Sequence, residues 1–92
     1  MLDFLVELIG TFIFLSVIIQ SSKLGAVGPL AIGLTLAAMI YFGGKISGGH
    51  FNPAVSVMFW MDKKLSEKRL IGHIIAQLIG AYLAFLLYKS IR

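Results

Sequence analysis

The chain has 92 residues, of which 59% are hydrophobic and only 13% are charged, whereas about 25% of the residues of a typical soluble domain are charged. A soluble domain of this length buries only about 60–65% of its surface, which excludes a water-soluble globular fold for so apolar a chain. The absence of cysteine excludes disulfide frameworks and thiolate metal sites, and the net charge of +4 is no nucleic-acid signal, because the basic residues fall between apolar runs.

Four uncharged runs divide the chain, at residues 8–22, 24–44, 46–61 and 70–88. A helix that crosses the bilayer needs about 20 apolar residues, which the second and fourth runs provide directly. The first run reaches this length when it begins near Phe4 and includes Glu7. We therefore predict an all-α, multi-pass integral membrane protein with spanning helices at about residues 4–22, 29–44 and 69–89.

The third run, residues 46–61, is not typical of a spanning helix. Its first half is rich in glycine, whereas the part from Pro53 onward is compatible with a helix of about nine residues, or roughly 13 Å. Asn52 is a strong N-cap, and proline is favoured at the first helical position. Irregular backbone at membrane depth is tolerated only inside protein or along a water-filled cavity. The run therefore indicates either a re-entrant loop with a half-helix beside a pore or, by spacing alone, a short loop on the membrane surface.

Residues 47–56, SGGHFNPAVS, resemble the first signature of the aquaporin and glycerol-facilitator (major intrinsic protein) family, SGxHxNPAVT, with Ser56 in place of threonine. Glu7-x3-Thr11-x2-Phe14 resembles the first helix of that family, and residues 31–35 and 75–81 resemble its second and third helices. Four matches in the family's order and spacing make the resemblance specific. It implies a channel for water or small neutral solutes such as glycerol, with no cofactor. The residues themselves form no catalytic constellation, so we expect no enzyme.

The resemblance covers one repeat of the family, whose members carry two inverted repeats of three helices plus an NPA half-helix. We therefore expect residues 1–92 to be a single aquaporin-like half-repeat. It would conduct as an antiparallel homodimer or with a complementary half. The alternatives are a non-conducting fragment and an assembly subunit of a full-length aquaporin. A protein like the small multidrug transporters is a further alternative, but their four full spans disagree with the break in the third run.

The basic residues give a weak orientation signal. With the N-terminus in the cytoplasm, five lie inside and three outside, namely Lys45, Lys63, Lys64, Lys68 and Arg69 against Lys23, Lys89 and Arg92. The positive-inside rule thus favours a cytoplasmic N-terminus by a small margin. So small a margin is compatible with insertion in both orientations, which a pore built from two inverted copies requires.

The resemblance implies a pore role for the residues of the NPA motif. Asn52, Pro53 and Ala54 would lie at the pore centre, where a half-helix N-terminus carries about half a positive charge and repels cations. The backbone carbonyls of Gly48, Gly49 and His50 would form a ladder of hydrogen-bond acceptors that leads to Asn52. The alternative for Asn52 is an ordinary N-cap without access to the lumen.

Two polar side chains inside the spans are candidate braces of the loop. Ionisable groups within a span are costly and mostly functional. The resemblance implies that Glu7 accepts hydrogen bonds from the loop backbone, the alternative being that it reaches the headgroups. Gln77 would brace the loop similarly, or else face lipid or serve only in helix packing. We expect His73 at the membrane interface, and neither histidine has a second ligand nearby that would suggest a metal site.

Small residues recur every four positions in the last run, at Gly72, Ala76, Gly80 and Ala84. Small residues at this spacing allow the backbones of membrane helices to approach closely. We therefore predict that these four positions form one helix-packing face.

The family's narrow filter is a ring of a second-helix residue, a fifth-helix residue and an arginine after the second NPA. Ile32 matches the second-helix position. In a two-fold pair of this chain, Ile40 and Val55 of the other copy would take the remaining two positions. The resulting constriction is apolar and carries no fixed charge, so we expect a weak preference for water over glycerol.

Overall fold

The computed structural model describes all 92 residues, and its only regular elements are helices. Three helices are long and apolar enough to cross a membrane: α1 (Leu2–Ser21), α2 (Gly28–Ser47, preceded by a 3-10 turn at Gly25–Val27) and α4 (Glu67–Ile91). Helix α3 (Pro53–Met61) has 9 residues. Three spanning helices and one helix of half that length confirm the predicted fold class.

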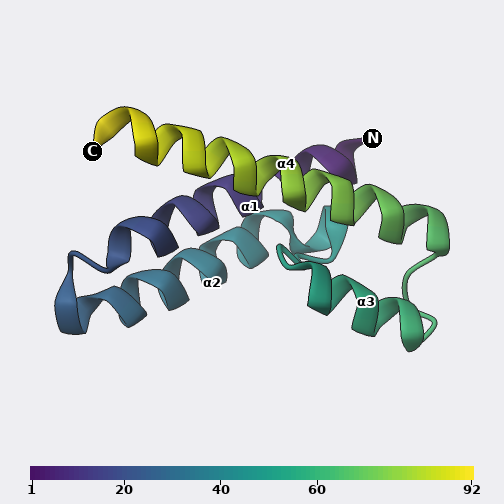
Figure 1. Cartoon of the computed structure of the whole chain (residues 1–92). Coiled ribbons are helices and arrows are strands. Elements are labelled where there is room, and N and C mark those ends of the chain that lie inside the picture. Colours follow the sequence, from purple (N-terminus) through teal and green to yellow (C-terminus); the bar gives the residue numbers. More distant parts are fainter.

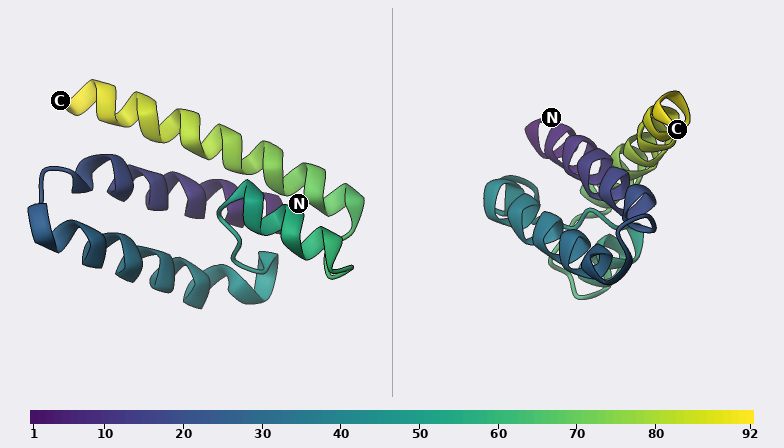
Figure 2. Two further views of the ribbon diagram at one scale, coloured as in Figure 1. Left: turned by 60° about the horizontal axis from the view of Figure 1, so that its bottom comes forward. Right: turned by 90° about the vertical axis from the view of Figure 1, so that its left-hand side faces the viewer.

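Helix α1 is the centre of the bundle and packs against α2 on one side and α4 on the other (Figures 1 and 2). After α2 the chain turns back along the bundle, and α3 then runs beside the first part of α4. The start of α1, the end of α2 and the start of α4 therefore meet at one end of the molecule.

Local capping signals explain where the helices begin and end. Helix α2 runs three residues past the expected end at residue 44, because Gly48 (φ 94°) provides the left-handed C-cap that stops a helix. The Asn52 side chain accepts a hydrogen bond from the Ala54 N–H at 2.9 Å and so caps α3. Helix α4 begins two residues before the expected start, because the Ser66 hydroxyl caps it through the Arg69 N–H.

The interior of the molecule is polar, whereas its surface is apolar. Only Phe51, Leu65, Ala76 and Ala84 are buried hydrophobic residues, and large aliphatic and aromatic side chains cover the outside of the three long helices. The fully buried side chains include Glu7, Thr11, Ser47, Ser56, His73 and Gln77. Lipid tails are as apolar as leucine, so such a bundle is held together by close packing and hydrogen bonds between its helices.

Three of the four small residues in the predicted ridge are buried, and Gly80 among them lies directly against α1. Ala76, Gly80 and Ala84 are buried, and a Cβ atom added at Gly80 would lie 2.7 Å from the Leu8 carbonyl oxygen. Gly72 corrects the prediction, because a Cβ atom there would meet nothing within 4 Å. Two helices that cross at an angle diverge toward their ends, and Gly72 lines an open space between the starts of α1 and α4, which only the long Arg69 side chain crosses to reach Asp3.

We expect Gly80→Leu to separate α4 from α1, since the added side chain meets backbone atoms of Leu8 and Phe12 rather than a side chain that can rotate away. Overpacking of this kind costs roughly 1–3 kcal/mol, and a backbone clash belongs at the upper end of that range. The measurement is the free energy of unfolding in lipid-free mixed micelles. Gly72→Leu is the matched control and should leave it unchanged. Equal stability of the two variants would contradict the packing face.

Candidate functional site

The loop between α2 and α3, residues 48–52, is fixed to the bundle by the Glu7 carboxylate. Glu7 is fully buried, and each of its oxygens accepts two hydrogen bonds. Oε2 accepts from the Ser47 hydroxyl at 2.6 Å and from the His50 N–H at 3.1 Å. Oε1 accepts from the Phe51 N–H at 2.8 Å and from the Gln77 amide at 2.9 Å. The carboxylate thus lies against the loop, and all four of its hydrogen bonds are made inside the protein.

Gln77 and Ser56 extend this network to the half-helix. The Gln77 side chain is buried, and its Nε2 atom also donates to the Ser56 hydroxyl at 2.9 Å. Ser56 Oγ lies 2.9 Å from His50 Nδ1, so the loop and the first turn of α3 are joined directly. The His50 ring in turn stacks on Phe59 with 4.8 Å between centroids. The four side chains hold loop, half-helix and α4 in one arrangement.

His73, which was expected at the membrane interface, is fully buried between the helices and so does not reach the headgroups. Its Nε2–H donates to the Ser47 carbonyl oxygen at 2.8 Å. That carbonyl belongs to the last turn of α2, where backbone carbonyls have no partner within the helix. A sequence signal for this role exists, because His73 precedes Gln77 by four positions and the two therefore share one helix face. The sequence patterns did not predict the hydrogen bonds that His73, Ser47 and Ser56 make in this network.

The loop backbone pairs all of its N–H groups from residue 48 to 51 and leaves its carbonyls free. Gly48 N–H donates to the Gly44 carbonyl, Gly49 N–H to the Ser47 hydroxyl, and the next two N–H groups to Glu7. No protein group donates to the carbonyl oxygens of Gly48, Gly49 or His50. Positive φ angles at Gly48, Gly49 and Phe51 (94°, 67° and 53°) give the backbone this shape. These three carbonyls therefore have no hydrogen-bond donor within the chain.

Asn52 is the residue that follows these carbonyls and caps the half-helix. Its Oδ1 atom caps α3 through the Ala54 N–H, and the residue is also exposed. The Nδ2 group donates to no protein atom and is free to bind a ligand. Pro53 is half-buried and Ala54 is exposed at the start of the half-helix.

The three residues of the expected constriction are not brought together within one chain. Ile32 and Ile40 lie on α2, eight positions or roughly 12 Å apart along the helix. Ile40 lies beside the loop, since a Cβ atom at Gly49 would come within 3.2 Å of its Cγ1 atom. Val55 is half-buried on α3. A ring of these side chains therefore needs residues from more than one copy.

One family model and several curated proteins match the sequence of this chain. The model of the family described as "Major intrinsic protein" matches residues 3–92. The chain is 42% identical over 95 residues to a protein named glycerol uptake facilitator protein-like 6 from Lactiplantibacillus plantarum, a match that covers 98% of this chain and 44% of that protein. It is 43% identical over 88 residues to aquaporin Z from Photorhabdus laumondii, covering 85% of this chain and 38% of that protein.

The lens fiber major intrinsic protein of Gallus gallus is 36% identical over 84 residues, which cover 84% of this chain and 32% of that protein. No solved structure matches the chain significantly. The chain thus spans less than half the length of each of these curated relatives.

Proposed function

The chain belongs to the major intrinsic protein family, is an integral multi-pass membrane protein, and, we propose, forms one half of a pore for water and small neutral solutes such as glycerol. Relatives named aquaporin and glycerol uptake facilitator support this class of permeant. We therefore propose that the chain acts as part of a channel and not as an enzyme.

The single observation that carries the proposal is the asymmetry of the loop backbone. The N–H groups of residues 48–51 are bound inside the protein, while the carbonyls of Gly48, Gly49 and His50 and the Nδ2 group of Asn52 have no partner in the chain. A water molecule that moves past these carbonyls exchanges hydrogen bonds with fixed acceptors and then meets a donor. The N-terminus of α3 adds about half a positive charge beside Asn52, which disfavours cations.

We propose that a second copy in the opposite orientation completes the pore, so that two Asn52 side chains meet at its centre. The weak charge bias of five basic residues against three supports insertion in both orientations. Each mouth would be lined by Ile32 of one copy and by Ile40 and Val55 of the other.

The experiment that tests this proposal uses two variants with locked and opposite orientations. In one variant, Lys89→Gln and Arg92→Gln leave five basic residues inside against one outside. In the other, the bias is reversed to two against five by Lys45→Gln, Lys63→Gln, Lys64→Gln, Ser22→Lys and Ala26→Lys. Terminal tags report the orientation of each variant in vesicles.

We expect water permeability, measured by light scattering after an osmotic step, in wild-type vesicles and in vesicles that contain both locked variants. Either locked variant alone should give only the permeability of the lipid. Conduction by a single locked variant would contradict the antiparallel pair. An impermeable wild type would instead favour the non-conducting fragment or the assembly subunit, for which co-purification with a longer family member is the direct check.

A further inference from the structure

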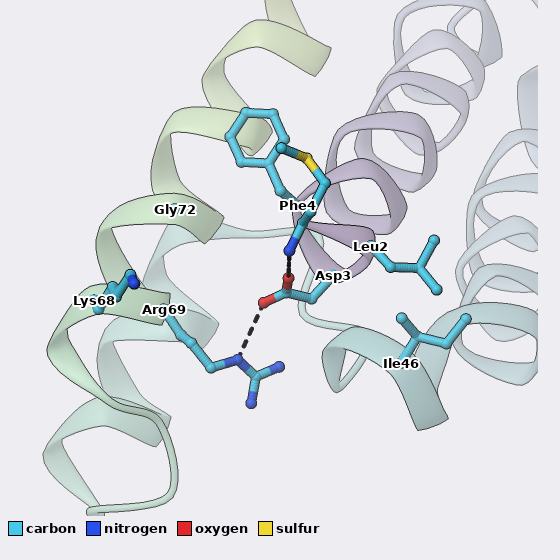
Figure 3. Close-up of a pocket in the computed structure, with 8 residues that line it drawn as sticks. Leu2, Asp3, Phe4, Ile46, Lys68, Arg69 and Gly72 are labelled. Atoms are coloured by element: carbon cyan, nitrogen blue, oxygen red, sulfur yellow. Dashed lines mark hydrogen bonds and ion pairs between the residues drawn. The ribbon is translucent and has the colours of Figure 1, made fainter.

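An open groove of about 680 Å³ lies at the end of the bundle where α1 begins, α2 ends and α4 begins (Figure 3). Its apolar walls include Leu2, Phe4 and Ile46, and its polar side chains are Asp3, Lys68 and Arg69. Three spanning helices have their ends here, so the groove lies at the level where lipid headgroups meet the hydrocarbon core. Neither the NPA loop nor its brace uses these residues.

Arg69 is held in place without its full hydrogen-bonding capacity being used. Its Nε–H donates to Asp3 Oδ2 at 3.1 Å, while the amino group of Met1 donates to Oδ1 at 3.1 Å. Both carboxylate oxygens are therefore occupied. The two terminal guanidinium nitrogens have no protein partner, and Figure 3 shows them directed away from Asp3. A guanidinium that is oriented and half-exposed in this way presents the planar fork that pairs with phosphate oxygens.

The rest of the groove suits a ligand with both an anionic and an apolar part. Lys68 makes no ion pair, and the groove carries three positive charges, on the Met1 amino group, Lys68 and Arg69, against the one carboxylate of Asp3. Leu2 and Ile46 are 60% and 41% exposed beside these cations. Gly72 leaves further room, because a Cβ atom there would meet nothing within 4 Å. A free phosphate ion would use the cations only, whereas a phospholipid would also cover the apolar walls.

We propose that this groove binds an anionic phospholipid, with the headgroup phosphate on Arg69 and Lys68 and the acyl chain against Leu2, Phe4 and Ile46. Tight binding requires a net negative charge on the lipid. A zwitterionic headgroup carries a cation of its own, which the positive side chains of Arg69 and Lys68 would repel.

Native mass spectrometry of the full chain in neutral detergent measures this binding. The probes are phosphatidylglycerol and phosphatidylcholine with identical acyl chains. We expect phosphatidylglycerol to bind roughly tenfold more tightly, because the choline cation of phosphatidylcholine is repelled by Arg69 and Lys68 while both lipids offer the same phosphate. Arg69→Gln should remove that preference. Lys89→Gln, the same loss of one positive charge at the other end of α4, should leave it unchanged. Equal losses in the two variants would mean general surface attraction and would overturn the site.

Gly72→Leu keeps every charge and places a larger side chain in the groove. A Cβ atom at this position meets nothing within 4 Å, so this variant should fold normally. It therefore tests the proposal even if Arg69→Gln fails to fold. It should weaken phosphatidylglycerol binding at least as much as Arg69→Gln. Inorganic phosphate at millimolar concentration should not displace the lipid. Unchanged lipid binding by Gly72→Leu, or displacement by inorganic phosphate, would overturn the proposal that a phospholipid occupies the groove.

Discussion

Glu7→Gln is expected to release the re-entrant loop. Four donors face the two carboxylate oxygens of Glu7, two to each oxygen. A glutamine of the same shape keeps one oxygen and turns an NH2 group toward the other two donors. One of those two is a backbone N–H, of His50 or Phe51, and it is left unsatisfied in the interior, whereas the Ser47 hydroxyl or the Gln77 amide beside it can turn an oxygen toward the NH2 group. A buried group without a partner costs about 1–3 kcal/mol, so the free energy of unfolding should fall by roughly 1–3 kcal/mol.

Hydrogen exchange distinguishes loss of the brace from a general effect on the bundle. The backbone amides of His50 and Phe51 donate directly to Glu7, and their exchange in micelles should accelerate by roughly 100-fold or more in Glu7→Gln. Amides in the middle of α1 should change less. If the loop forms the pore lining, water permeability falls together with this protection.

Asp3→Asn is the matched control, because it makes the same change of carboxylate to amide on the same helix. Asp3 makes ion pairs only at the partly exposed end of the bundle. Such pairs contribute about 0–1 kcal/mol, so this variant should retain nearly the stability of the wild type in lipid-free micelles. Equal effects of the two substitutions, or unchanged exchange at His50 and Phe51 in Glu7→Gln, would rule out the brace.

Val55→Arg is expected to change the solute preference of the proposed two-copy pore. The wild-type constriction of Ile32, Ile40 and Val55 offers no hydrogen-bond partner, so water loses more on entering it than a solute with more carbon surface. An arginine there supplies fixed donors and narrows the passage. We expect the ratio of glycerol to water permeability to fall by roughly tenfold, a loss in the range that pocket shape and polarity produce.

The ratio is measured on the same reconstituted vesicles, with water permeability from an impermeant osmotic step and glycerol permeability from swelling in a glycerol gradient. Val57→Arg is the control, because it adds the same charge to α3 at a half-buried position outside the proposed ring. A ratio unchanged by Val55→Arg, or firm rejection of glycerol by the wild-type protein, would contradict the apolar constriction.

The sequence by itself determined the number of spans and the break in the third run, because hydropathy and capping act within a few residues of chain. Asn52 and Pro53 start a helix wherever the fold places them. Gly48 shows how such a signal can be misjudged by a few positions. The uncharged run ends at residue 44, before Lys45, and so predicted the end of the helix there, but α2 continues through Lys45 until the left-handed Gly48 stops it.

Only the tertiary structure decided which polar groups meet and which small residues pack. The Ser47 carbonyl and His73 are 26 positions apart, and Asp3 and Arg69 are 66 apart, so no local pattern relates either pair. Gly72 and Gly80 belong to the same series of small residues, spaced every four positions on α4. Gly72 nevertheless lines an open groove, whereas Gly80 lies against the backbone of α1. The physical reason is that the crossing of whole helices fixes these contacts, and the crossing depends on the packing of every side chain between them.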